Sequence, residues 1–311
     1  MATATYLARR LGQSVLTVFL TLTVVFLLIR MAPGDPASAY AGPTASTSEL
    51  ARIRAQFGLD RPLFAQYGIY LRDLVTGNFG TSYSFHAPAF DVVMDRLPYT
   101  LTLAVSAIAV TVVVAVPLGV WMAHHADSAR ELGANIFTIA GQSMPDFWTG
   151  VMLLTVFAVL FPVLPASGFT SWGGLVLPTI TVAVLQLALV SRLVRREMST
   201  ALASSYVTVA RSRGVSERAL TWRYALANSA VPLVTAVGTR FAALLNGVVV
   251  VEVVFGWPGV GSLVVRALDT RDYPLIQATV LVTAALALLV QLLVDLCYPL
   301  LDPRVRLGKA A

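Results

Sequence analysis

The chain has 311 residues, of which 57% are hydrophobic and only 12% carry a charge, and its mean hydropathy is +0.76. Ordinary soluble domains contain about 25% charged residues, so this composition excludes that class. The formal net charge of +6 belongs mainly to arginines in loops between apolar runs, which indicates a membrane-topology signal and argues against a nucleic-acid-binding surface.

Six apolar runs follow one another along the chain, and each is long enough to cross a hydrocarbon core, which takes about 20 helical residues. The first run is too long for the core of a cleavable signal peptide, so we expect a retained anchor. Prolines inside four of the runs are compatible with membrane helices, because neighbouring groups satisfy the freed backbone. The sequence predicts an all-α integral membrane protein with six transmembrane helices at 11–31, 98–123, 134–161, 176–194, 229–255 and 275–300.

Arginine and lysine are distributed unevenly between the predicted loops. Six spans place both termini on one side, whose loops hold 13 Lys or Arg residues against five acidic residues, whereas the opposite loops hold eight of each. Positive charge collects in the short cytoplasmic loops of membrane proteins. We therefore expect the N-terminal segment 1–10 and the tail 301–311 to be cytoplasmic.

The predicted first extracytoplasmic loop, residues 32–97, is unusually long. Unstructured loops beyond about 12–15 residues are uncommon in compact domains. This loop is also too rich in aromatic residues for a disordered segment. We expect a folded outer element, although an aromatic rim at the membrane surface would explain the same residues, which are Phe57, Phe64, Tyr67, Tyr70, Phe79, Tyr83, Phe85 and Phe90.

The predicted core of five spans, residues 98–300, is interrupted by a basic and polar segment at 199–228. Ser205 is expected to cap a short helix from Tyr206 to Arg213, and Gly214 to end it in the left-handed conformation. Ser216 is expected to cap a second helix that runs to residue 228. Such a cytoplasmic helix-turn-helix is either a solvated loop or a docking element for another protein.

Three of the ionisable residues inside predicted spans are candidates for function, because charge is costly there. A further one, Asp295 near the inner end of the sixth span, is expected to be a helix cap or an interfacial salt bridge. Asp146 and Arg240 are each near the middle of a span, and Glu252 is nearer the outer end of the fifth. Asp146 and Arg240 could form a buried ion pair that holds two spans together. Alternatively, they could face the channel and meet the charged ends of a substrate.

Signatures of common enzymes are missing from the sequence. The only lysine, Lys309, precedes an alanine, so no GxxxxGK[ST] phosphate loop exists, and neither HExxH nor GxSxG occurs. The single cysteine, Cys297, rules out an internal disulfide and a paired thiolate metal site. We therefore expect no catalytic residue, no metal ligand and no cofactor in this chain.

Four segments share a resemblance: 59–82, Tyr206–Gly214, Glu252–Gly261 and Asp295–Arg304. They resemble the ABC-importer permeases of the dipeptide and oligopeptide family. The stretch from Tyr206 to Gly214 is similar to the family's EAA signature, although the preceding position, often acidic there, is Ser205. The others are the outer-loop residues 59–82, the stretch from Glu252 to Gly261 with its WPGVG sequence, and the stretch from Asp295 to Arg304 with its DPR sequence at 302–304. Together these similarities cover most of the chain.

This resemblance implies a permease subunit of an ATP-driven peptide importer in a bacterial inner membrane. The implied partners are a second permease, two ATP-binding subunits that hold ATP and Mg²⁺, and an extracytoplasmic substrate-binding protein that meets the outer element. Contact with the ATPase would fall to Tyr206, Ala210, Arg211, Arg213 and Gly214. The translocation pathway or its gate would include Asp146, Arg240, Glu252 and Trp257.

A second class of function remains open at this point. In an ion- or proton-coupled secondary transporter, Asp146, Arg240 and Glu252 would form a charge relay. Inverted repeats with matched broken helices would favour that class, but the sequence contains no convincing internal repeat.

Overall fold

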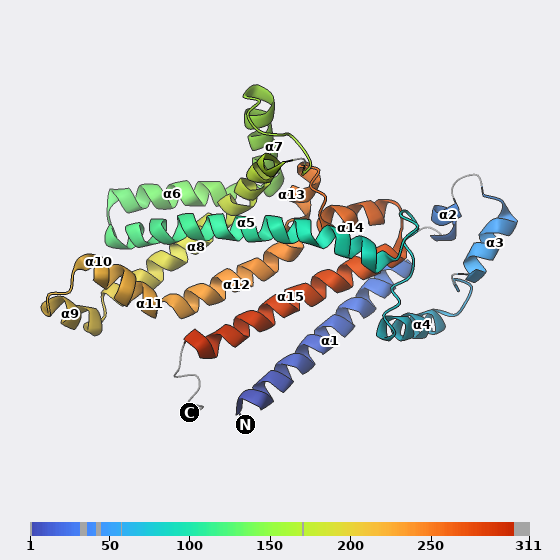
Figure 1. Ribbon diagram of the computed structural model, residues 1–311, viewed down its shortest axis with the longest axis horizontal. Coiled ribbons are helices and arrows are strands. Elements are labelled where there is room, and N and C mark those ends of the chain that lie inside the picture. Colours follow the sequence, from blue (N-terminus) through green and yellow to red (C-terminus); the bar gives the residue numbers. More distant parts are fainter. Residues whose placement is uncertain (1, 32–35, 42–44, 57, 170, 302–311) are drawn as a thin grey trace. The chain divides into compact units, whose positions relative to one another are not determined.

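The computed structural model describes residues 2–31, 36–41, 45–56, 58–169 and 171–301 (Figure 1). These residues are mostly helical, and the contacts between them divide the chain into two compact units. The first unit comprises residues 1–100 and 258–286, and the second comprises residues 101–257 and 287–311. The expected tail with its DPR sequence at 302–304, and Phe57 of the outer loop, lie outside the described residues.

The first unit contains the N-terminal helix and the outer segment. Its elements are α1 (Ala2–Met31), α2 (Pro36–Ala41), α3 (Thr47–Gln56), α4 (Leu63–Val75), the start of α5 (Ala89–His124), α14 (Val260–Asp269) and the start of α15 (Tyr273–Leu301). The core of this unit joins Ile29 of α1, Val93 of α5, Val260 of α14 and Leu275 of α15. The expected folded element within 32–97 is thus a set of short helices.

A buried carboxylate fastens the loop between α4 and α5 to the start of α15. Asp272 is fully buried, and its Oδ2 accepts hydrogen bonds from the Ser82 hydroxyl at 2.5 Å and the Ser84 N–H at 2.9 Å. Its Oδ1 accepts the N–H of Leu275 at 3.2 Å, which satisfies a free donor in the first turn of α15. The Asp272 side chain therefore both anchors the loop and caps the first turn of α15.

The second unit contains the remaining helices, several of them short. They are α6 (Ala129–Ser143), α7 (Asp146–Leu154), the π-helix η1 (Thr155–Leu160), the 3₁₀-helix η2 (Trp172–Leu175), α8 (Val176–Leu202), α9 (Ser205–Ser212), α10 (Glu217–Ala219), the π-helix η3 (Leu220–Ala225), α11 (Leu226–Asn228), α12 (Ala230–Gly247) and α13 (Val249–Val254), with the end of α15.

A small residue sets the closest approach inside the second unit. A Cβ on Gly119 of α5 would lie 2.5 Å from both the Ser191 carbonyl oxygen and the Val194 Cβ of α8. Small residues let membrane helices pack closely, because lipid provides no hydrophobic drive for their association. Val190, Val194 and other apolar residues form the core at this crossing.

The predicted membrane spans agree with the structure in number only if two bent pairs each count as one. Within the described residues, four helices are long and apolar enough to cross a membrane: 12–31, 89–124, 172–202 and 273–294. The second of these begins at Ala89, whereas the sequence pattern placed its start at residue 98, because the polar turns 89–97 continue the same helix. The chain is thus an all-α, multi-pass membrane protein.

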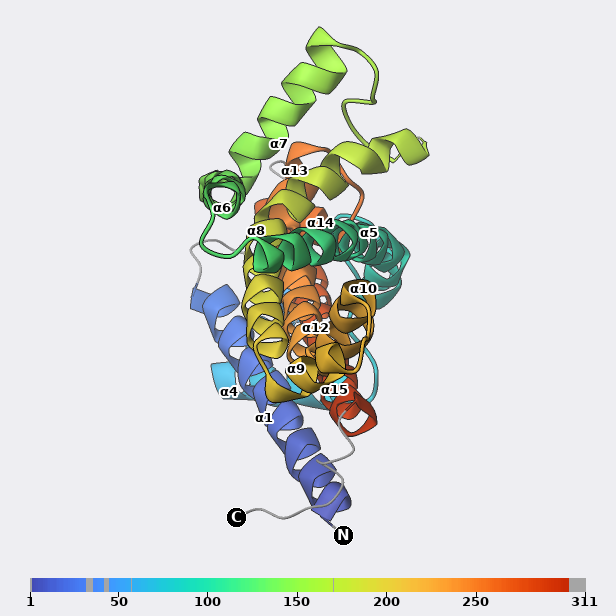
Figure 2. The ribbon, with the colours of Figure 1, turned by 90° about the vertical axis from the view of Figure 1, so that its left-hand side faces the viewer.

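The span expected over 134–161 is wrong as a straight helix. The segments Ala129–Ser143 and Asp146–Leu160 meet at 96°, and Figure 2 shows α6 end-on with α7 leading away from it. The break falls at Met144, whose ψ of 131° is extended, because the ring of Pro145 disfavours the helical conformation in the preceding residue. By contrast, Pro178 and Pro232 lie in first helical turns, where proline is tolerated.

Candidate functional site

Helix α9 occupies the centre of the basic segment. It runs from Ser205 to Ser212, so the residue at its N-cap is Ser204, one position before the expected Ser205. The Ser204 hydroxyl makes no capping bond and donates instead to the Ala201 carbonyl at the end of α8. The predicted cap was therefore wrong, because α8 and α9 follow so closely that the hydroxyl is used by the preceding helix.

The turn after α9 confirms the expected role of Gly214. Its φ is +80°, in the left-handed region that glycine adopts without strain. The Val215 N–H donates to the Ala210 carbonyl at 3.3 Å, and the Gly214 N–H donates to the Arg211 carbonyl at 3.0 Å. These two bonds form a Schellman motif. Its apolar contact is also present, since Val215 packs against the cluster of Val207, Ala210 and Leu220.

The second helix of the segment starts where the sequence placed it. The Ser216 hydroxyl accepts the Ala219 N–H at 3.4 Å, and helical structure continues to Asn228. The π-helical turn η3 in its middle was not anticipated. Within η3, Thr221 bonds the Glu217 carbonyl at 2.8 Å and the His124 Nε2 at 2.9 Å, which ties the segment to the end of α5.

Arg211 has a partner within this chain. Its Nε and Nη2 donate to Glu217 Oε1 and Oε2 at 2.6 Å and 3.1 Å, a bidentate pair across the Gly214 turn. These hydrogen bonds hold the pKa of the Glu217 carboxyl below its usual value and raise the pKa of Arg211. Both side chains are about half exposed, so the pair leaves room for an external contact.

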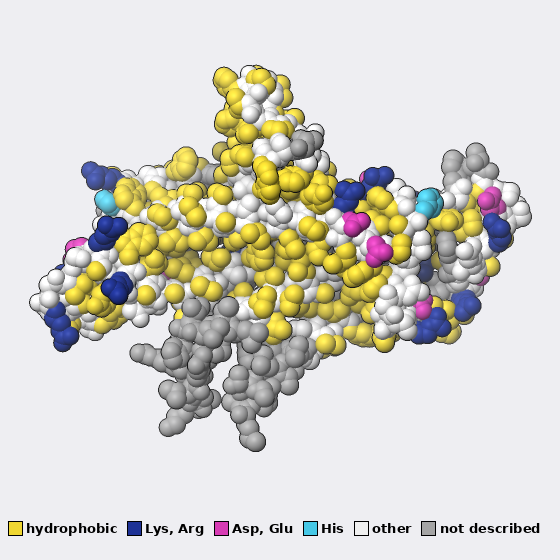
Figure 3. Space-filling view, viewed as in Figure 1, with side chains coloured by type: hydrophobic (Ala, Val, Ile, Leu, Met, Phe, Trp, Pro, Cys, Tyr) yellow, Lys and Arg dark blue, Asp and Glu magenta, His cyan; other side chains and the backbone are white. Residues whose placement is uncertain are grey.

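The other predicted contact residues divide into buried and exposed positions. Ala210 is 8% exposed and faces the interior of the helix-turn-helix, so its side chain supports the fold and offers little surface. Tyr206 and Arg213 line a hollow of about 450 Å³ with Val209, Val215 and Tyr224. Arginines gather around this end of the second unit in Figure 3, while the neighbouring helix surfaces are apolar.

The structure gives no support to a buried pair of Asp146 and Arg240. Asp146 is the first residue of α7 and half-buried, whereas Arg240 of α12 is exposed. Ion pairs in the described part of the chain join Arg72 to Asp73, Arg195 to Glu131 and Arg211 to Glu217. The pairing was suggested by the similar positions of Asp146 and Arg240 along their predicted spans. The chain bends before Pro145, so Asp146 is the first residue of a helix and does not lie in the middle of one.

Glu252 and Trp257 lie together at a tightly packed turn. Glu252 of α13 is fully buried, and its carbonyl accepts the Trp257 N–H at 2.7 Å. The Trp257 ring is 1% exposed and packs edge-on against Phe169 at 5.1 Å. The Gly168 N–H donates to the Phe255 carbonyl at 2.9 Å, so the loop before η2 closes over this turn. Phe169 and Phe255 were missed by sequence reasoning, which had no signal for this contact.

The comparisons with known proteins agree with this architecture. Residues 115–307 match the family described as binding-protein-dependent transport system inner membrane component, and residues 3–104 match the N-terminal family of the same component. The chain belongs to this family. It is therefore an ABC-importer permease, a transport component, and the ion-coupled alternative loses its basis.

Two relatives match this permease over nearly its full length. A probable peptide ABC transporter permease, y4tP of Sinorhizobium fredii, is 38% identical over 97% of this chain and 99% of its own. The glutathione transport system permease GsiC of Escherichia coli K12 is 35% identical over 97% of this chain and 98% of its own. A solved structure, described as an amino acid ABC transporter with histidines, is 18% identical and covers 69% of this chain and 94% of its own, with a TM-score of 0.48.

Proposed function

We propose that this permease forms half of the translocation pathway of an ATP-driven peptide importer, and that α9 with its following turn couples it to a cytoplasmic ATPase. The observation that carries the proposal is the helix-turn-helix of residues 205–228. A Schellman turn, a buried apolar cluster and the Thr221–His124 bond hold it together as a rigid projection with exposed Tyr206 and Arg213. A solvated loop would need none of these contacts.

The proposed complex contains a second, related permease, two ATP-binding subunits or domains and an extracytoplasmic substrate-binding protein. The family is defined by dependence on a binding protein, and this sequence contains no phosphate loop of its own. ATP and Mg²⁺ are therefore held by the partners. The charge distribution supports cytoplasmic termini, and the family description supports a bacterial inner membrane.

The proposed substrate is a peptide. One relative is named as a probable peptide permease and the other as a glutathione permease, and glutathione is itself a short peptide. The proposed pathway and gate comprise Asp146, Arg240, Glu252 and Trp257. The packed turn of Glu252 and Trp257 fits a closed gate, because both residues are buried and the loop before η2 covers them.

The test is reconstitution of the complete importer in proteoliposomes. We expect loaded binding protein to stimulate ATP hydrolysis and peptide uptake. Tyr206→Ala and Arg213→Glu, which alter the hollow beside α9, should each reduce co-purification of the ATPase. Arg52→Glu, an exposed position on α3, serves as the control and should leave co-purification unchanged. Uptake driven by an ion gradient without ATP would contradict the proposal.

A further inference from the structure

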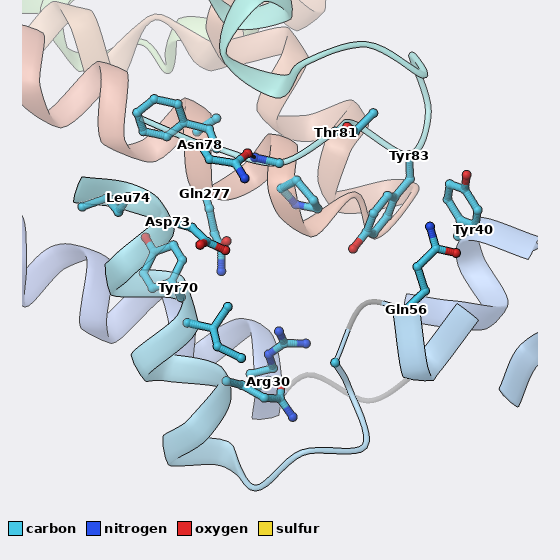
Figure 4. A pocket seen from close by; sticks show the side chains of 17 residues that line it. Arg30, Tyr40, Gln56, Tyr70, Asp73, Leu74, Asn78, Thr81, Tyr83 and Gln277 are labelled. Carbon is cyan, nitrogen blue, oxygen red and sulfur yellow. Dashed lines mark hydrogen bonds between the residues drawn. The ribbon is translucent and has the colours of Figure 1, made fainter. Parts of the chain in front are cut away.

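A second cavity lies within the first unit and belongs to none of the sites described above. Its volume is about 490 Å³, which falls in the range of about 300–1,000 Å³ typical of small-molecule sites. It is walled by the end of α1, the end of α3, helix α4, residues 78–83 and the first turns of α15, and side chains from these elements point into it in Figure 4.

Arg30, near the end of α1, places a guanidinium at the cavity wall. Aromatic rings hold it in place, since its carbon Cζ lies 5.4 Å from the centre of the Phe26 ring and 5.6 Å from that of Tyr273. Its Nε is buried and has no hydrogen-bond partner among the described residues. A buried donor without a partner is costly and is normally satisfied by water or a ligand.

Two further polar atoms from α4 are buried at the cavity without a partner in the described part of the chain: the Tyr70 hydroxyl and Gln66 Oε1. The Gln66 Nε2 donates to the Leu59 and Arg61 carbonyls at 3.1 Å and 2.8 Å, which fixes the amide and leaves Oε1 as an acceptor. Burial, with the neighbouring Tyr67, raises the pKa of Tyr70 to about 12, so its hydroxyl stays protonated and can donate.

Asp73 supplies a carboxylate to the same cavity. The Nε and Nη2 of Arg72 donate to its Oδ1 at 3.1 Å and 2.8 Å. In Figure 4 Asp73 lies beside Gln277 and Tyr70, with Arg30 across the cavity. The cavity thus holds one cation and one anion, separated by amide and hydroxyl groups that suit a peptide bond.

We propose that this cavity binds a short peptide by its free ends, with Arg30 receiving the terminal carboxylate and Asp73 the terminal ammonium group. A guanidinium and a carboxylate in one cavity complement the two charged ends of a zwitterion. Arg72 bonds Oδ1 of Asp73, which leaves Oδ2 to accept from the ammonium group of the ligand. The assignment of a peptide rests on the proposed function. The cavity would give the permease direct contact with its substrate, apart from the turn of Glu252 and Trp257.

The experiment measures binding of trialanine to the complex of permeases and ATPases in nanodiscs, without the substrate-binding protein. Trialanine amide lacks the carboxylate, and N-acetyl-trialanine lacks the ammonium group. We expect Arg30→Gln to weaken trialanine binding by about tenfold or more, since losing a charge-assisted contact typically has that effect. Binding of the amide should not change. Asp73→Asn should weaken trialanine in the same way and leave N-acetyl-trialanine unchanged.

Two controls keep the result interpretable. Arg52→Gln removes an exposed arginine from the same unit and should leave every affinity unchanged. Arg30→Lys retains the charge and should recover part of the loss. The selective response to the amide and acetyl derivatives separates a binding role from misfolding, because a misfolded variant would lose affinity for all three probes.

Several results would overturn the proposal. The first is that trialanine does not bind the unaltered complex at about 10 mM, a concentration that detects even weak sites. The second is that a variant loses affinity equally for all three probes. The third is that the variants impair only the stimulation by the binding protein. Uptake of peptide in proteoliposomes is measured alongside. Uptake without direct binding would reject this cavity alone, whereas binding without any peptide uptake would reject the proposed importer.

Discussion

Gly214 is the residue on which the geometry of the coupling segment depends. No atom lies within 4 Å of the position a Cβ would take, so a side chain meets no steric obstacle there. The whole cost of substitution comes from φ, which at +80° is strained by about 1–3 kcal/mol for most residues. A substitution at Gly214 therefore changes the strain in the backbone without changing the packing around it.

We expect Gly214→Val to misdirect α9 and to reduce either ATPase co-purification or the ATP hydrolysis stimulated by loaded binding protein. Gly214→Asn is the matched control, because asparagine tolerates the left-handed region far better than a β-branched residue. It should retain most of both activities. Neither substitution lies in a membrane span, so the amount of permease in the membrane should not fall. Equal behaviour of Val and Asn would contradict a role for the turn.

The Arg211–Glu217 pair allows internal and external roles of Arg211 to be separated. Arg211→Glu places two carboxylates side by side and should weaken coupling. The swapped double variant, Arg211→Glu with Glu217→Arg, restores the pair across the turn. If Arg211 acts only within the segment, the double variant should recover ATPase stimulation; if it also contacts the ATPase, stimulation stays low. Recovery is measured as binding-protein-stimulated hydrolysis.

The pH dependence of this pair follows from the lowered pKa of Glu217. Its contribution is complete above the ordinary glutamate pKa of about 4.3 and is lost as pH falls through the lowered value. Titration of the pair therefore cannot explain any change in coupling between about pH 6 and 8. Raised salt should weaken it, because both side chains are exposed.

At the scale of elements, the crossing of α5 and α8 depends on Gly119. We expect Gly119→Leu to overpack this crossing, which typically costs about 1–3 kcal/mol, and to lower the thermal unfolding midpoint of the purified complex. Gly133→Leu on α6 is the control, because no atom lies within 4 Å of its added Cβ. A similar midpoint for both variants would mean that the helices do not approach closely at residue 119.

The sequence predicted helices well and their breaks poorly. Long apolar runs identify spans because a helix needs about 20 apolar residues to cross the hydrocarbon core. Gly214 and Ser216 predict a turn because glycine adopts the left-handed conformation after a helix and serine caps the start of the next helix. The break at Pro145 could not be separated from the tolerated Pro178 and Pro232, because the sequence does not show which of these prolines lies in the first turn of a helix. The cavity around Arg30 was missed because it joins residues from segments far apart in the chain.

For the whole molecule, the membrane orientation is the prediction on which the proposed function depends. In a Cys297→Ser background, cysteines at the exposed positions Ser46 and Thr208 should react differently with an impermeant thiol reagent in intact cells. We expect labelling at 46 and none at 208 until the membrane is permeabilised. Labelling at 208 alone would reverse the topology and place α9 on the side away from ATP.

The π-helical turn η3 bears on how the chain tolerates changes in length. Its hydrogen bonds reach five residues along the chain, so it holds one residue more than an α-helix needs. Deleting exposed Arg223 would convert it into an ordinary α-helical turn, while α10 and α11 keep their directions. Deleting Thr208 from α9 would rotate the following turn by about 100°. Co-purification of the ATPase should survive the first deletion and fail after the second, so η3 would be a place where this chain tolerates the loss of one residue.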